Sequence, residues 1–283
     1  MNSDDLGLFG PDSITWKVHA EPVLMVAGLR ALYLQSLHPR AMAGVAQNSN
    51  YRTDAWGRLV RTSEYVATTI FGTTAEAERA GRRIRAVHAR MSAKDPLTGT
   101  PFRVDEPDLL RWVHVTEVES FVGTARRAGV ALTGDEVDRY YTEQRRAAAL
   151  VGLDPDSVPG SAAEVEAYYR EVRPQLRMTR EAAETALFLT VPPIPWKVSL
   201  PVRLGLTLGP PRWAYLGLAT TALGLLPAWA RRLYGGLGLP TTALSADLGV
   251  RTLRLALTAV PRHLLIGPIQ VAARERAARH AAG

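Results

Sequence analysis

The chain has no cysteine among its 283 residues. This absence excludes disulfides, zinc sites built on thiolates, iron–sulfur clusters and cysteine nucleophiles. Any bound metal must therefore be held by nitrogen or oxygen ligands. Histidine is also scarce, with six in the whole chain, so the position of each imidazole is informative.

The sequence also lacks the short motifs of several large enzyme classes. It contains no Walker loop, no dinucleotide-binding glycine fingerprint, no H-E-x-x-H and no G-x-S-x-G elbow. The net charge of +7 comes mostly from arginines spread over predicted helix surfaces, without a recognisable nucleic-acid-binding module. We therefore expect no nucleic-acid partner.

Two features bear on the cellular location. The start of the chain, Met1-Asn-Ser-Asp-Asp, is acidic where a secretory signal would be basic, so we expect a cytoplasmic protein. The segment 213–230 has no charged residue and approaches the length of a membrane span, but two glycines and a proline interrupt it. We expect it to be a buried helix, and contact with a membrane surface stays open.

Several segments carry the start signals of helices. The S/T-x-x-E spacing of a capping box marks three predicted helix starts, and a proline in a predicted first turn marks a fourth. These signals are Thr73 with Glu76, Thr133 with Glu136, Ser161 with Glu164, and Asp105-Glu-Pro107. The pattern predicts an all-α fold, a single globular multi-helix domain over 1–283, with an irregular arm over 1–17 and a basic tail over 272–283.

Two neighbouring predicted helices each point a histidine inward. The helix over about 76–91 places His88 on the same side as Ile84 and Val87, and the helix over about 108–126 places His114 beside Val113. Taken alone, either histidine is best explained as a core residue with a satisfied backbone partner.

One helix upstream, a basic and hydroxyl-bearing face precedes His88. Arg58, Arg61, Thr62 and Tyr65 fall at i, i+3, i+4 and i+7, so they lie on one side of a helix. An exposed basic stripe is the ordinary explanation. Together with the inward imidazole of His88, however, the face fits a metal cofactor with an anionic rim.

A series of short motifs occurs in a fixed order along the chain. They are His38-Pro-Arg-Ala-Met-Ala-Gly44, Tyr51-x-x-Asp54, Arg58-x-x-Arg61-Thr62, Val87-His88, Asp108-Leu-Leu-Arg-Trp112-Val-His114 and Val158-Pro159. In this combination the chain resembles the family of the rubber oxygenases (latex clearing proteins) and the oxygenase that cleaves the farnesyl chain in mycophenolic acid biosynthesis. The resemblance covers roughly residues 20 to 235.

This resemblance implies a heme b in a pocket between central helices, with the iron bound by one histidine that matches His88. It further implies that Arg58 and Thr62 lie near the distal side, where they polarise dioxygen or fix the cofactor. Latex clearing proteins have a lysine directly before this threonine that can occupy the distal iron position. Arg61 stands there in this chain, and a guanidinium stays protonated, which makes it a poor iron ligand. Arginines such as Arg58 and Arg61 can pair with heme propionates, and His114 is expected near the proximal ligand or in the pocket lining.

The resemblance predicts a heme-b oxygenase that uses dioxygen on an apolar, unsaturated or isoprenoid-like small molecule. Two alternatives stay open. One is a non-catalytic helical protein that binds lipid or docks on a membrane, and the other is a relative that uses the same pocket for non-redox chemistry. The sequence does not specify an oligomeric state.

Overall fold

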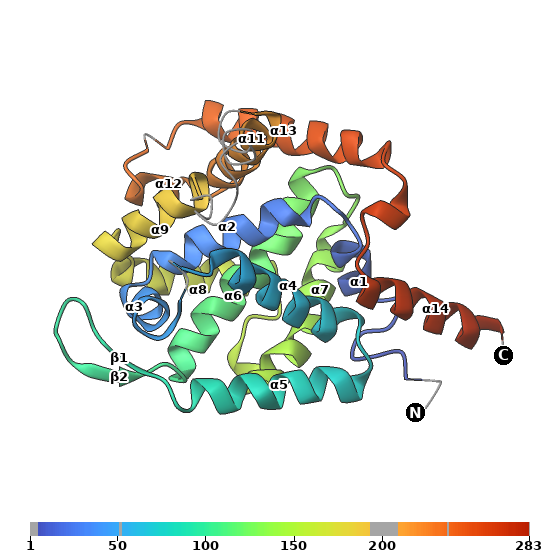
Figure 1. Cartoon of the computed structure of the whole chain (residues 1–283), viewed down its shortest axis with the longest axis horizontal. Coiled ribbons are helices and arrows are strands. Elements are labelled where there is room, and N and C mark those ends of the chain that lie inside the picture. The colour runs from blue at the N-terminus through green and yellow to red at the C-terminus, as the bar shows by residue number, and fades with distance from the viewer. Residues whose placement is uncertain (1–4, 51–52, 193–208, 237, 283) are drawn as a thin grey trace.

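The computed structural model describes residues 5–50, 53–192, 209–236 and 238–282, and these are almost entirely helical (Figure 1). The all-α prediction is confirmed. The helices are α1 (Ile14–His19), α2 (Leu24–Ser36), α3 (Pro39–Asn48), α4 (Ala55–Phe71), α5 (Thr74–His88), α6 (Pro107–Arg127), α7 (Gly134–Leu150), α8 (Ala162–Val172), α9 (Arg180–Thr190), α11 (Pro210–Gly224), α12 (Ala228–Leu233), α13 (Pro240–Thr258) and α14 (Pro268–Ala282). Short 3₁₀ turns occur at η1 (Pro155–Ser157), η2 (Arg173–Gln175) and η3 (Arg262–Leu264), and β1 (Ser92–Lys94) pairs antiparallel with β2 (Pro101–Arg103).

Two of the three predicted capping boxes form in full. The hydroxyls of Thr73 and Thr133 accept from the backbone N–H three residues later, and the glutamates there accept from the threonine N–H in return. The third capping box is incomplete. The Ser161 hydroxyl caps α8, but the Glu164 carboxylate accepts from the N–H of Gly160 instead of from that of Ser161. These local bonds explain why the starts of α5, α7 and α8 can be predicted from the sequence.

Both terminal segments contain helix in the described residues. Helix α1 begins at Ile14, because the Ser13 hydroxyl caps it, so residues 14–17 of the irregular arm expected over 1–17 are helical. The Trp16 indole is buried and donates to the carbonyl of Ile70, which fastens α1 to α4. The expected basic tail over 272–283 is mostly helix α14, which begins earlier, at Pro268, and packs against α4.

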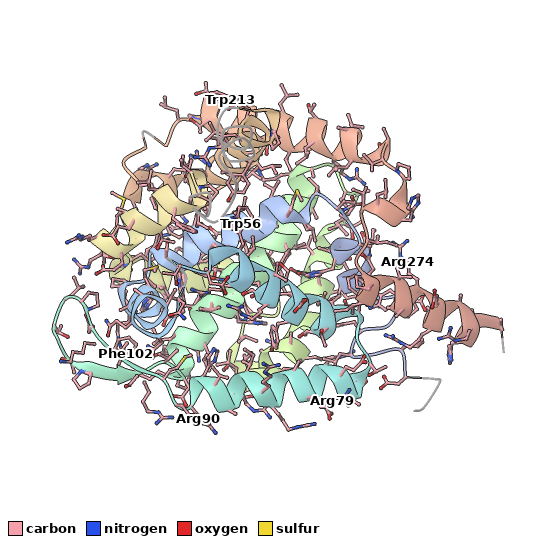
Figure 2. All side chains as sticks on the ribbon, viewed as in Figure 1. Trp56, Arg79, Arg90, Phe102, Trp213 and Arg274 are labelled. Atoms are coloured by element: carbon pink, nitrogen blue, oxygen red, sulfur yellow. The ribbon has the colours of Figure 1, made fainter. Side chains whose placement is uncertain are left out.

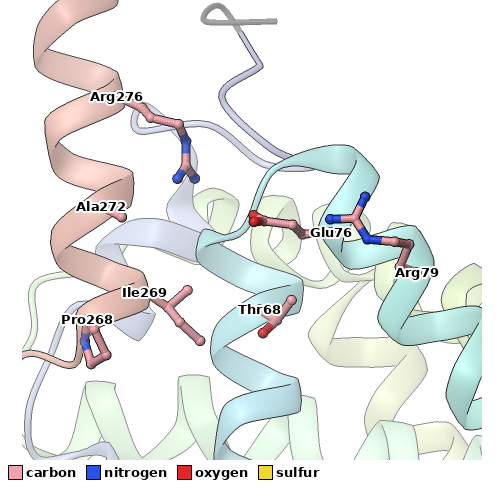
Figure 3. A pocket seen from close by; sticks show the side chains of 7 residues that line it. All are labelled: Thr68, Glu76, Arg79, Pro268, Ile269, Ala272 and Arg276. Atoms are coloured by element: carbon pink, nitrogen blue, oxygen red, sulfur yellow. The ribbon is translucent and has the colours of Figure 1, made fainter. Parts of the chain in front are cut away.

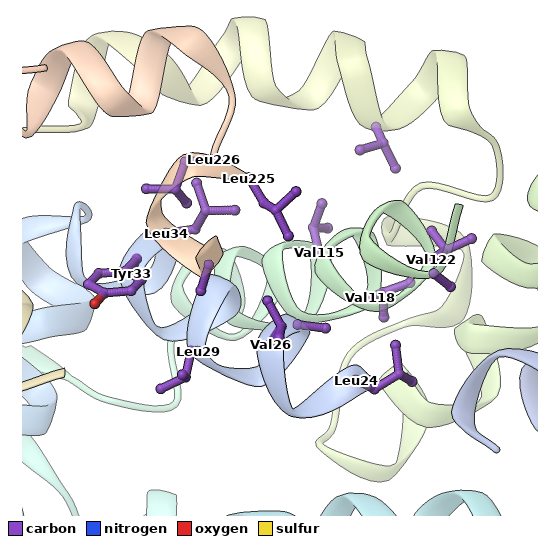
Figure 4. Close-up of a cluster of buried hydrophobic side chains, with 14 of the residues drawn as sticks. Leu24, Val26, Leu29, Tyr33, Leu34, Val115, Val118, Val122, Leu225 and Leu226 are labelled. Atoms are coloured by element: carbon purple, nitrogen blue, oxygen red, sulfur yellow. The ribbon is translucent and has the colours of Figure 1, made fainter. Parts of the chain in front are cut away.

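Helix α2 is the centre of the core. Most of its side chains are buried, and it packs chiefly on α6 and also on α9 and α11 (Figure 4). Its fully enclosed residues Val26 and Leu34 lie in one cluster with Val122 of α6 and with Leu225 and Leu226, which follow α11. Fully burying a side chain of this size stabilises a fold by about 1.5–3 kcal/mol, so this cluster fixes the positions of the surrounding helices.

The uncharged stretch 213–230 forms two shorter helices, α11 and the start of α12. Ala219, Ala222 and Leu225 are completely buried, as expected of a core segment, whereas Trp213 is 66% exposed. Within the described ranges, no helix combines the length and apolar character needed to cross a bilayer.

Candidate functional site

Helices α4 and α5 form a hairpin with a turn at Gly72 and Thr73, so they run side by side in opposite directions (Figure 1). Position 58 lies about as far before this turn as position 88 lies after it. Arg58, Thr62 and His88 therefore all lie toward the open end of the hairpin, away from the turn. No hydrogen bond or ion pair joins the predicted basic face to His88 among the described residues.

Helix α5 lies very close to α7 because small residues face the contact. Ala77 and Gly81 are its buried residues, and a Cβ added at Gly81 would lie 2.7 Å from the carbonyl oxygen of Leu150. Val87, predicted to share an inward face with His88, is instead 39% exposed. The side of α5 that faces the protein contains Ala77, Gly81 and, further along the helix, His88. Val87 lies on the adjacent side.

His88 is the last residue of α5 and is half-buried. Its Nδ1 atom is enclosed and has no hydrogen-bond partner among the described residues. Burial lowers the pKa of the imidazole, and the carboxylate of Asp105 opposes this shift. The imidazole is therefore neutral at pH 7, which is the form that binds metals, and Asp105 is a nearby acceptor of the kind that orients histidine ligands.

Two of the other histidines already have structural partners. The Nε2 atom of His19 lies 3.0 Å from the Tyr140 hydroxyl, and burial lowers the pKa of this imidazole to about 3. His38 caps α3 by accepting at Nδ1 from the N–H of Ala41, and it is buried. His263 and His280 are exposed near the C-terminus. These placements leave His88 and His114 as the half-buried imidazoles without a hydrogen-bond partner in the described structure.

His114 lies on α6, half-buried, at the contact with α7 and α8. It borders a narrow void that Tyr141, Pro159 and Val165 also line, and burial lowers its pKa to about 4. Val113, expected beside it on the inward face, is 37% exposed. No hydrogen bond or ring contact joins His114 to His88 in the described ranges.

The two predicted arginines of α4 have different surroundings. Arg58 is partly buried and its Nη1 donates to the Ser49 hydroxyl at 2.9 Å. Arg61 turns back along the helix to the Asp54 carboxylate at 3.1 Å, and its side chain is 63% exposed. Thr62, one turn after Arg58, is exposed. Arg61 therefore lies at the solvent-exposed edge of the α4 face, which we call the rim. Tyr51, the first residue of one resemblance motif, falls outside the described residues.

Facing interior positions of α4 and α6 hold Tyr65 of the predicted α4 face together with Thr69 and Glu117, which the sequence did not single out as site residues. The hydroxyls of Tyr65 and Thr69 are buried, and neither has a hydrogen-bond partner in the described structure beyond the contact between these two hydroxyls. Glu117 of α6 is close enough to affect the Tyr65 hydroxyl electrostatically, and burial raises the pKa of Glu117 to about 7. Its position one turn after His114 was the signal available in the sequence.

A separate surface pocket of about 500 Å³ lies between the C-terminal part of α4, the start of α5 and α14 (Figure 3). It is lined by Thr68, Glu76, Arg79, Pro268, Ile269, Ala272 and Arg276. Glu76 and His88 are twelve residues apart on one helix, which corresponds to about 18 Å. The pocket therefore belongs to the opposite end of α5 from His88.

In the described ranges, no group of three or more His, Asp or Glu side chains is arranged to hold a metal ion. Among known proteins, the sequence model of the family described as "ER-bound oxygenase mpaB/B'/Rubber oxygenase, catalytic domain" matches residues 16–259. The matched region contains Arg58, Arg61, Thr62, His88 and His114. It extends at both ends beyond the range of about 20 to 235 that the resemblance covers. No curated protein and no solved structure matches the chain.

Proposed function

Because the chain belongs to the family of mpaB and rubber oxygenase catalytic domains, and is thus an oxygenase, we propose that it is a heme-b enzyme with His88 as the iron ligand. Its substrates would be dioxygen and an apolar, unsaturated or isoprenoid-like small molecule. Membership in a family of catalytic domains favours an enzyme over the non-catalytic lipid-binding alternative. A cytoplasmic location stays a prediction from the sequence.

The unpartnered Nδ1 atom of His88 is the observation that carries the proposal. Enclosed polar atoms in proteins are nearly always hydrogen-bonded, so an unpaired one is consistent with a bound group that the protein atoms do not supply. The porphyrin of a heme supplies four nitrogen ligands to the iron, so the protein needs to supply one more, such as a neutral imidazole. His88 is neutral at pH 7, which meets this requirement.

The hydroxyls of Tyr65 and Thr69 add independent support. They are buried on α4 with no partner in the described structure beyond each other. Burial raises the pKa of the nearby Glu117 carboxyl on α6 to about 7. These polar groups from two helices fit an interior that holds a polar-edged ligand in the native protein.

Within this proposal the arginines and Thr62 have distinct tasks. Arg58 and, at the rim, Arg61 would pair with the heme propionates, since a guanidinium binds a carboxylate with two parallel hydrogen bonds. Arg58 and Thr62 would also present N–H and O–H donors to dioxygen, and fixed donors of this kind contribute most where negative charge develops. His114 would line the proximal side of the pocket.

Bound heme would supply the dioxygen chemistry that protein side chains lack. The chain's own contribution is to bind, to orient and to exclude water. Glu117 would hold a proton at a carboxyl oxygen near neutral pH, because its pKa of about 7 keeps roughly half of the group protonated there.

Reconstitution with hemin tests the assignment of the iron ligand. We expect the wild-type protein to give a Soret band with one heme per chain. His88→Ala should lose most of this heme, whereas the matched variant His280→Ala, in the exposed C-terminal part of α14, should retain it. Retention of heme by His88→Ala with an unchanged spectrum would contradict the assignment, and a wild-type protein that binds no heme would contradict the cofactor.

A further inference from the structure

Helix α13 presents a line of apolar side chains on the surface of the molecule. Leu244, Leu248 and Leu255 are 66%, 68% and 69% exposed. Their spacing of four and then seven residues puts them within about 40° of one another around the helix. Arg251 falls in the same line and is exposed, and its Nε donates to the carbonyl of Arg127 at 3.0 Å. We call these four residues the α13 line.

The neighbouring helix α11 adds an exposed tryptophan to this side of the molecule. Helices α11 and α13 pack together, and Figure 1 shows both on the far side of α2 from α5. Trp213, near the start of α11, is 66% exposed and lies at the outer edge of the molecule in Figure 2. Aromatic rings with a polar N–H are favoured where apolar and aqueous surroundings meet.

The outward direction of the α13 line is fixed by contacts on the opposite side of the helix. Ala246 and Val250 are buried there, and a Cβ added at Gly224 of α11 would lie 2.7 Å from the Ala246 Cβ. Asp247 accepts from the Arg127 guanidinium, and Arg254 pairs with Glu21 at 2.9 Å. The leucines therefore cannot turn inward without breaking ion pairs and close packing.

Positive charge is concentrated in the same part of the chain. Residues 185–274 contain nine Lys and Arg residues and one acidic residue, Asp247. The rest of the chain is balanced, with 25 basic and 26 acidic residues. Within this segment Arg232, Arg251 and Arg262 are exposed, and the one acidic residue, Asp247, is paired with Arg127. Arg231 is buried and Arg254 is paired with Glu21. The exposed charge around the α13 line is therefore positive.

We propose that the α13 line and Trp213 dock the protein on the surface of an anionic phospholipid bilayer. Exposed leucines and a tryptophan would enter the interfacial layer, while Arg251 and neighbouring arginines contact lipid phosphates. Charge argues against a second copy of the chain as the occupant, because a symmetric contact would bring two positively charged surfaces together. An anionic bilayer complements both the apolar and the basic character of this face.

Vesicle flotation with the full-length protein tests this docking. We expect the protein to float with vesicles of phosphatidylcholine and phosphatidylglycerol, to bind much less to pure phosphatidylcholine, and to be released by high salt. Leu244→Ser/Leu248→Ser should lower the bound fraction about tenfold, and Arg251→Glu should lower it on anionic vesicles.

The matched control is Leu97→Ser/Met178→Ser, which removes two exposed side chains (57% and 46%) outside α11 and α13 and should bind like the wild type. Equal binding by the two double variants, or no flotation on anionic vesicles, would overturn the proposal. So would a concentration-dependent dimer in light scattering that Leu244→Ser/Leu248→Ser abolishes, because the face would then be a contact between copies. Heme content plays no part in these readouts, so the outcome is independent of the assigned cofactor.

Discussion

The Arg30 guanidinium on α2 donates to both carboxylate oxygens of Glu119 on α6, at 2.5 and 3.0 Å. Arg30 is 3% exposed, and its remaining donors reach the Ser120 hydroxyl and the Leu225 carbonyl. The Tyr169 hydroxyl donates to Glu119 as well. This ion pair thus joins the two central helices and the segment after α11 inside an otherwise apolar cluster.

Removing one member of this pair should be strongly destabilising. Arg30→Met leaves the Glu119 carboxylate without its charge partner, and we expect the free energy of unfolding to fall by about 3–5 kcal/mol in urea titrations. Arg30→Met/Glu119→Met removes both charges and should recover part of that loss. A single variant as stable as the wild type would show that the pair does not hold α2 on α6.

Glu117 should make stability depend on pH. Burial raises its pKa to about 7 from a model-compound value of 4.5. Between these values the unfolded chain has released the proton while the folded protein retains it, so stability falls as pH rises from about 4.5 to 7 and is then constant. Allowing for its partial exposure, we expect Glu117→Gln to stabilise the protein by about 2 kcal/mol at pH 8 and to have little effect at pH 4.

The control for this pH dependence is Glu166→Gln, since Glu166 is exposed on α8. Urea titrations at pH 4, 6 and 8 should give the same stability difference at each pH for Glu166→Gln. A Glu117→Gln variant whose effect does not change with pH would mean that this carboxyl has an ordinary pKa.

Local signals account for what could be predicted of the fold. The helix starts at Thr73 and Thr133 could be predicted because a capping box involves only residues within one turn. The predictions of which side of each helix is buried were less accurate. In α5 the buried residues are Ala77 and Gly81, whose small side chains contribute little to a hydrophobic pattern. The pattern therefore predicted Val87 on the inward side, although Val87 is exposed.

The candidate site depended more on resemblance and on tertiary contacts. The ordered motifs led to the family that the comparison confirmed. No sequence pattern could show that Arg61 pairs with Asp54 at the rim, since this depends on the side-chain direction at the start of α4. Nor could it show the burial of Glu117, which is created by helices distant in sequence.

The two arginines of α4 should therefore differ in their effect on heme binding. Arg58→Ala removes a partly buried guanidinium, and we expect heme affinity to fall about tenfold, as for the loss of a charge-assisted hydrogen bond. Arg61→Ala removes an exposed ion pair with Asp54 and should change both heme affinity and stability only slightly. Hemin titration followed by absorption measures both. Equal losses for the two variants would mean that Arg61 reaches the cofactor as closely as Arg58 does.

The position of His88 depends on how closely α5 approaches α7, which makes Gly81 the glycine that tests this contact. In Gly81→Ala the new Cβ would lie 2.7 Å from the Leu150 carbonyl oxygen and 3.1 Å from the Leu150 Cβ, so the helices must separate. We expect a loss of about 1–3 kcal/mol in stability, typical of overpacking, together with weaker heme binding. Gly217→Ala is the matched control, because that helical glycine has open space around its Cβ position and alanine there should stabilise α11 by up to about 1 kcal/mol. If thermal unfolding shows the same sign for both variants, the close α5–α7 contact is not what positions His88.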